Sequence, residues 1–66
     1  MNRKLSAKRM EILILLAEGL NSIEIANELG NSPATINNIR KEMLLQMDAK
    51  NVAHMVSIAY KKGILN

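Results

Sequence analysis

Apolar residues recur every three or four positions through most of the chain, as they do on one face of a helix. In the first segment Leu13, Leu16, Ala17 and Leu20 share one such stripe and are expected in the core. No run alternates apolar with polar residues as a half-buried strand does, and valine is scarce. The pattern therefore predicts an all-α protein. Glycines interrupt it at Gly19, Gly30 and Gly63.

Residues that cap helices set the limits of the first two predicted helices. The Ser6 hydroxyl can accept a bond from a free amide of the first turn, and Gly19 supplies a left-handed exit. Asn21, with Glu24 three residues later, forms a capping box ahead of an apolar run. A first helix therefore follows Ser6, and a second helix covers about 21–29.

Similar signals start the third and fourth helices. Ser32 is a suitable N-cap, and Pro33 follows at the first helical position, where its missing amide costs nothing. This helix is predicted over about 33–47. After a short connection, Asn51 caps a fourth helix over about 51–62. Four helices then account for nearly the whole chain.

The length of 66 residues favours a single domain, 1–66, with one small core. The chain has no cysteine and one histidine, His54, which excludes disulfides, thiolate zinc sites and cysteine nucleophiles. With no glycine-rich phosphate loop either, we expect no enzyme, no cofactor, no metal site and no small-molecule substrate.

The longest apolar run, Ile12 to Ala17, is far shorter than the ~18 residues that suggest a membrane span. No signal-peptide pattern follows the charged start of the chain. We therefore expect a soluble, cytoplasmic protein without membrane association. The net charge of +3 leans toward a nucleic-acid partner but decides little by itself.

The segment around Gly30 carries the most informative pattern. The small Ala26 lets two helices approach, Gly30 turns the chain, and apolar steps of three to four residues resume after it. This spacing is typical of the helix-turn-helix, whose second helix enters the major groove of DNA. An ordinary helical hairpin is the alternative. The residues of the pattern are Ile25, Ala26, Leu29, Gly30, Ile36 and Ile39.

A wider set of residues extends this pattern to Leu5-Ser6, Glu11-Ile12-Leu13, Leu15 to Leu20, Glu24-Ile25-Ala26, Leu29, Ser32, Thr35-Ile36, Met43, Met47, Asn51, Val56, Ala59 and Gly63-Ile64. With these residues the chain resembles, from Leu5 to Leu65 and without a gap, the LuxR/GerE/FixJ-type DNA-binding domain. The resemblance implies a four-helix LuxR-type helix-turn-helix domain of a bacterial transcription regulator. It also implies that the third helix reads DNA and that the fourth commonly forms the dimer contact.

Departures from the family pattern fall mostly on positions that would face DNA. The family commonly has lysine where this chain has Ile23, Asn37 and Gln46. It commonly has histidine at Ile39 and arginine at Val52. Each neutralised phosphate adds to the salt-dependent part of DNA affinity, so these departures imply weaker sequence-independent binding.

Polar side chains of the third helix lie opposite its apolar side on a helical wheel. Asn37, Asn38 and Lys41 occupy this face and are the candidate base-reading residues. Asparagine can donate and accept along the N6/N7 edge of adenine, and lysine can donate to guanine or to a phosphate. The two asparagines therefore favour an A·T-leaning site. The alternative is that all three are ordinary solvated residues.

Contacts to DNA phosphates are expected from Ser32, Thr35, Arg40 and Lys50. Ser32 and Thr35 lie at the positive end of the third helix, where anions bind readily. Arg40 lies beside the reading face, and Lys50 lies near the start of the fourth helix. The alternatives are that Ser32 only caps its helix, that Arg40 covers apolar surface with its stem, and that Lys50 is an exposed loop lysine.

Apolar residues crowd the fourth helix beyond one narrow stripe. Ala53, Ile58 and Tyr60 spread to its sides and are the candidate dimer interface. A twofold homodimer would read an inverted repeat. The alternative is that such residues complete the core of a monomer.

Taken together, the residues and the resemblance predict sequence-specific binding of double-stranded DNA and transcription regulation by a homodimer. The alternative function is a protein-interaction module on the same fold, with weak or no DNA binding. Such a module would bind another regulator through Met10, Ile14, Ile23 or the fourth helix.

Overall fold

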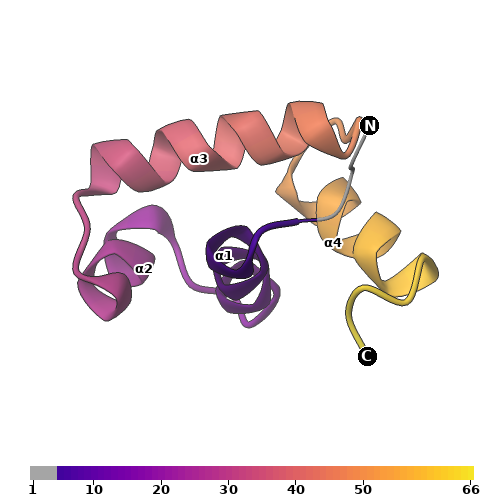
Figure 1. Cartoon of the computed structure of the whole chain (residues 1–66), viewed down its shortest axis with the longest axis horizontal. Coiled ribbons are helices and arrows are strands. Elements are labelled where there is room, and N and C mark those ends of the chain that lie inside the picture. The colour runs from indigo at the N-terminus through magenta and orange to yellow at the C-terminus, as the bar shows by residue number, and fades with distance from the viewer. Residues whose placement is uncertain (1–4) are drawn as a thin grey trace.

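The computed structural model describes residues 5–66, so the first four residues of the expected domain lie outside the described part. Its helices are α1 (Ala7–Ala17), α2 (Ser22–Leu29), α3 (Pro33–Gln46) and α4 (Val52–Lys61). Residues 5–66 contain no strand, which confirms the all-α fold class. α3 is the longest helix, and α2, α1 and α4 follow one another beneath it (Figure 1). Among the described residues, none of the helices has the length and apolar composition needed to cross a membrane.

Each helix begins at the cap that the sequence predicts. Asn21 and Glu24 form the reciprocal capping box, in which both N···O distances are 2.9 Å. The side chains of Ser6, Ser32 and Asn51 each accept a hydrogen bond from the amide three residues later. The start of every helix is therefore encoded within a few neighbouring residues.

The turn between α2 and α3 has a left-handed residue where the glycine pattern predicts one. Gly30 adopts φ 68° and ψ 36°, a conformation that is costly for residues with a Cβ. The next amide, that of Asn31, donates to the carbonyl oxygen of Ala26 at 2.9 Å. Because only residues 30–32 connect the two helices, α2 packs directly beside α3.

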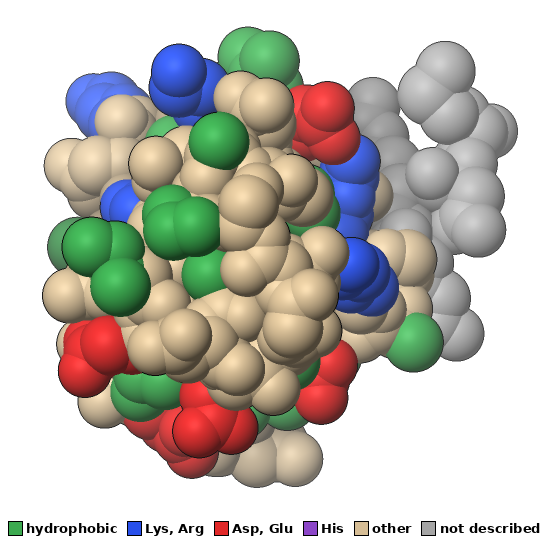
Figure 2. Space-filling view, turned by 90° about the vertical axis from the view of Figure 1, so that its left-hand side faces the viewer, with side chains coloured by type: hydrophobic (Ala, Val, Ile, Leu, Met, Phe, Trp, Pro, Cys, Tyr) green, Lys and Arg blue, Asp and Glu red, His purple; other side chains and the backbone are tan. Residues whose placement is uncertain are grey.

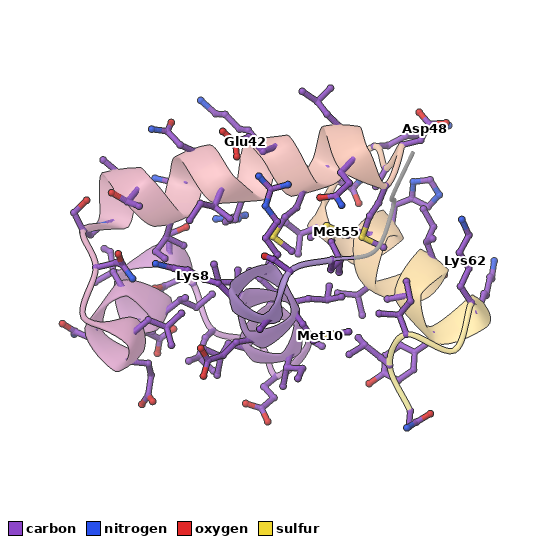
Figure 3. The ribbon with its side chains drawn as sticks, viewed as in Figure 1. Lys8, Met10, Glu42, Asp48, Met55 and Lys62 are labelled. Atoms are coloured by element: carbon purple, nitrogen blue, oxygen red, sulfur yellow. The ribbon has the colours of Figure 1, made fainter. Side chains whose placement is uncertain are left out.

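All four helices contribute to a single core. Ile36 and Met43 of α3 are fully buried, and Met55 of α4 lies beneath this helix (Figure 3). Two residues expected in the core, Ala17 and Leu20, are only half-buried at its edge. Burial of one side of α3 turns its opposite side to solvent. The buried apolar residues are Ile12, Leu13, Leu16, Ile25, Ala26, Ile36, Met43, Met55 and Ala59.

The connection between α3 and α4 contains a non-glycine residue in the left-handed region. Asp48 has φ 53°, and the amide of the next residue, Ala49, donates to the carbonyl oxygen of Leu44 at 2.9 Å. The Lys50 amide donates to Nδ1 of His54 at 3.0 Å. These bonds define the turn and hold Lys50 beyond the C-terminal end of α3.

Candidate nucleic-acid interface

The most exposed face of α3 is formed by residues spaced three or four positions apart. They lie opposite the buried side of the helix, and one of them, Leu45, is 83% exposed. We call Ala34, Asn38, Lys41 and Leu45 the outward stripe. Two of the candidate base-reading residues, Asn38 and Lys41, therefore lie on the surface that is most open to a ligand.

Arg9 of α1 binds two side chains along one edge of α3. Its Nη2 donates to Oε1 of Glu42, forming an ion pair, and its Nη1 donates to Oε1 of Gln46 at 2.6 Å. We call these three residues the Arg9 clamp; Glu42 is labelled in Figure 3. The clamp balances the negative charge that Glu42 would otherwise place beside the outward stripe. Nothing local in the sequence indicates this ion pair, because Arg9 and Glu42 are 33 positions apart.

Ser22 of α2 binds two side chains along the other edge of α3. Its hydroxyl accepts from Nη1 of Arg40 at 2.6 Å and donates to Oδ1 of Asn37, also at 2.6 Å. The Arg40 Nη1 lies 3.5 Å from the same Asn37 oxygen. We call Ser22, Asn37 and Arg40 the Ser22 cluster. Ser22 is 7% exposed and is the one buried polar residue in the described part of the chain; sequence reasoning did not single it out.

The Ser22 cluster borders a shallow hollow of about 260 Å³ on α3. Asn37, Arg40, Lys41 and Leu44 line it. The structure thus brings together two of the candidate base-reading residues and one candidate phosphate contact. The two neighbouring cations, Arg40 and Lys41, make this hollow attractive to an anionic ligand.

The remaining candidate phosphate contacts lie at opposite ends of α3. Ser32 and Thr35 are exposed at its start, and their hydroxyl oxygens are 2.9 Å apart. Lys50 is exposed beyond its end. A helix of 14 residues is about 20 Å long, which exceeds the ~12 Å width of the major groove. The two ends can therefore face different DNA backbones while the middle of α3 faces base edges.

Charged side chains are divided between α2 and α3. α2 exposes Glu24 and Glu28, whereas α3 carries Arg40, Lys41 and Glu42, the last of which is paired with Arg9. Figure 2 shows most acidic side chains of this face in its lower part and most Lys and Arg side chains in its upper part, toward α3. This distribution of charge favours an anionic ligand on the α3 side over the exposed surface of α2.

The candidate dimer residues of α4 do not share one face. Ala53 and Tyr60 are exposed on the same side of the helix, with Ser57 between them. Ile58 lies about 140° away from Ala53 at 100° per residue. It lines a separate hollow with Leu5, His54 and other residues. The structure thus brings Ala53 and Tyr60 together but not Ile58.

Comparison with known proteins identifies the family. A family model described as bacterial regulatory proteins, luxR family, matches residues 3–59. The chain belongs to the LuxR family. Membership confirms the resemblance drawn from the sequence, and the match includes the whole of α2 and α3. LuxR-family domains are DNA-binding transcription regulators rather than enzymes. No curated protein gave a significant match to this chain.

Two departures of this LuxR-family chain from the common pattern now have a structural explanation. At Asn37 and Gln46, where the family commonly has lysine, the side-chain oxygen accepts a hydrogen bond within the protein. A lysine ammonium has no acceptor and cannot replace either group. The Arg9 clamp and the Ser22 cluster therefore need a hydrogen-bond acceptor at these two positions, which lysine does not supply.

Proposed function

We propose that this LuxR-family chain binds double-stranded DNA with sequence specificity and regulates transcription, with α3 in the major groove. The observation that supports this proposal is the outward stripe. It is exposed along nearly the whole of α3, and hydrogen bonds of the Arg9 clamp and the Ser22 cluster hold the two edges of this helix. A helix attached on both sides presents its side chains in one orientation, which base reading requires.

In this proposal Asn37, Asn38 and Lys41 contact base edges. Asn38 offers a donor and an acceptor, which suits the N6/N7 edge of adenine, and Lys41 offers donors for O6 and N7 of guanine. Leu45 adds an exposed apolar group that suits the methyl group of thymine. The four side chains together would read a few adjacent base pairs.

Phosphate contacts in this proposal come from Ser32, Thr35, Arg40 and Lys50. Ser32 and Thr35 lie where the free amides and the dipole of α3 favour an anion. Lys50 reaches a backbone from the other end of the helix. These contacts set the register of α3 on the duplex without reading sequence.

We further propose that two copies pair through α4. Ala53 and Tyr60 form an exposed stripe with Ser57 between them, and Tyr60 is 51% exposed. A twofold contact on this stripe would present two α3 helices to an inverted repeat. Ile58 lies on another side of α4 and would stay outside this contact.

Selection from a random duplex pool, followed by titration at two salt concentrations, tests DNA binding. We expect one preferred sequence and a steep fall of affinity with salt. Asn38→Ala should weaken the preferred duplex by about 5- to 150-fold, the range expected for one bidentate base contact. Asn27→Ala, at an exposed position of α2, is the matched control and should bind like the parent. Failure to select any sequence would overturn the proposal.

A second candidate function is binding of another regulator protein. Ile14 and Ile23 are exposed, and a hollow of about 670 Å³ beside α1 is lined in part by Met10, Ile14 and Leu29. An apolar surface of this kind suits a protein partner. This function would gain support if the salt titration gave no DNA binding below millimolar duplex.

A further inference from the structure

The Ser22 cluster determines which end of the Asn37 amide faces the protein. The Arg40 guanidinium carries only donors, and its Nη1 lies 2.6 Å from the Ser22 hydroxyl oxygen. The Ser22 hydroxyl has one hydrogen, which it gives to Oδ1 of Asn37. Donors from Ser22 and Arg40 thus converge on Asn37 Oδ1.

The opposite orientation of the Asn37 amide is unfavourable. It would place the Nδ2 donors 3.5 Å from the Arg40 donor and leave the Ser22 hydroxyl hydrogen without this acceptor. An asparagine amide is oriented by its hydrogen-bond partners. Here the Arg40 guanidinium offers hydrogens only, and the Ser22 hydroxyl gives its one hydrogen to Asn37 Oδ1. The oxygen of Asn37 is therefore occupied before any ligand arrives.

We propose that Asn37 contacts DNA as a hydrogen-bond donor only. This selects guanine or thymine, rather than adenine, as the base that it contacts. Ser22 and Arg40 act as positioning residues, because they occupy the Asn37 oxygen. The inference rests on the proposed binding of DNA by α3. Asn38 has no side-chain partner among residues 5–66 and keeps both its donor and its acceptor. Two adjacent and identical side chains thus read different bases.

The preference follows from the groups that each base presents in the major groove. Guanine offers acceptors at N7 and O6, and thymine offers an acceptor at O4. Adenine places the N6 amino donor beside its N7, and cytosine offers only a donor at N4. Because Ser22 and Arg40 face its oxygen, Asn37 offers DNA its Nδ2 hydrogens, which neither amino group can accept. Asn37 is therefore expected to contact an acceptor of guanine or thymine, and not the N6/N7 edge of adenine expected for a free asparagine.

Base preferences of substituted chains test this inference. The position that Asn37 reads is found as the one that loses its preference in Asn37→Ala. At this position the parent should favour guanine or thymine over adenine by roughly fivefold, as one hydrogen bond provides. Arg40→Met removes the cation that faces Asn37 Oδ1, so the amide can turn and donate from Nδ2 to the Ser22 hydroxyl. The preference should then fall below about twofold.

Arg40→Lys is the conservative variant, because it restores a donor-only cation. It should recover the preference for guanine or thymine even where overall affinity stays reduced. If Arg40→Met weakens binding to all duplexes equally and leaves the preference intact, Arg40 is only a phosphate contact and the inference is wrong. If the parent selects no sequence at all, the proposed function fails and the inference fails with it.

A measurement without DNA separates these two failures. Asn37→Asp places an acceptor-only carboxylate against the donors of Ser22 and Arg40, whereas Asn38→Asp, on the neighbouring exposed position, has no such partners. The first substitution should raise the melting temperature by about 3 °C over the second. It should also lower the pKa of the introduced carboxyl group relative to that in Asn38→Asp. Equal melting temperatures and equal titrations would overturn the proposed orientation of Asn37.

Discussion

At the scale of single residues, Ser22 links α2 to α3 through one hydroxyl group. It occupies the first turn of α2, where a sequence pattern shows only a small polar residue near a helix start. Its hydroxyl nevertheless joins two side chains of α3. Because hydroxyls in a first helical turn are common, nothing in the sequence distinguishes Ser22 from an ordinary residue. Only the packing of α2 on α3 reveals its role.

Ser22→Ala should destabilise the free domain by about 1–2 kcal/mol, since it removes two hydrogen bonds at a buried position, one of them to a cation. Urea denaturation followed by circular dichroism measures the change. Ser57→Ala is the control, because Ser57 is exposed in α4 and alanine favours helix. Equal stabilities of the two variants would contradict the account of the Ser22 cluster.

Asp48 stores backbone strain that glycine would relieve. With φ 53°, Asp48→Gly should raise the free energy of unfolding by up to about 1 kcal/mol. Asp48→Val, which keeps a Cβ and adds branching, should lower it. The same urea titration gives both values, and a glycine variant less stable than the valine variant would refute this account.

At the scale of helices, the sequence predicts where each helix begins, but it does not predict the contacts between helices. Each cap depends on residues three positions apart, and the turn at Gly30 depends on one residue, so both could be predicted from the sequence. The Arg9 clamp joins α1 to α3 across 33 and 37 positions. Its existence depends on how α1 crosses α3, which periodicity along one helix does not specify.

The Arg9 clamp should affect DNA binding through Glu42. Arg9→Met leaves the Glu42 carboxylate unpaired near the phosphates, so affinity at low salt should fall roughly threefold. Arg9→Met combined with Glu42→Gln removes that charge and should recover the loss. Fluorescence titration of DNA with the parent, the two single variants and the double variant gives the coupling energy between Arg9 and Glu42. A double variant as weak as Arg9→Met would instead indicate a direct contact of Arg9 with DNA.

At the scale of the whole molecule, the dimensions of the domain limit what one copy can read. Its longest extent is 28 Å, whereas the half-sites of helix-turn-helix dimers are about 34–36 Å apart. One copy therefore covers one half-site. A longer operator requires a second copy, and the exposed side of α4 is the surface we propose for that contact.

Tyr60→Glu should disrupt pairing by placing a charge in the proposed twofold contact. Binding to an inverted repeat should lose its cooperativity, while binding to a single half-site should remain within about twofold of the parent. Ile23→Asn, which changes an exposed apolar residue outside α4, is the control. Sedimentation of each chain on the two duplexes measures the stoichiometry. An unchanged two-to-one complex would exclude Tyr60 from the contact.

Hydrogen bonds along both edges of α3 should affect the heat capacity change of DNA binding. The Arg9 clamp and the Ser22 cluster are formed in the free protein, so little of the chain has to become ordered when DNA binds. Proteins that fold on binding show large negative heat-capacity changes, because they bury far more surface than the contact itself. Here the heat capacity change of association should correspond only to the surface that protein and DNA bury against each other. The enthalpy of association should then vary almost linearly with temperature.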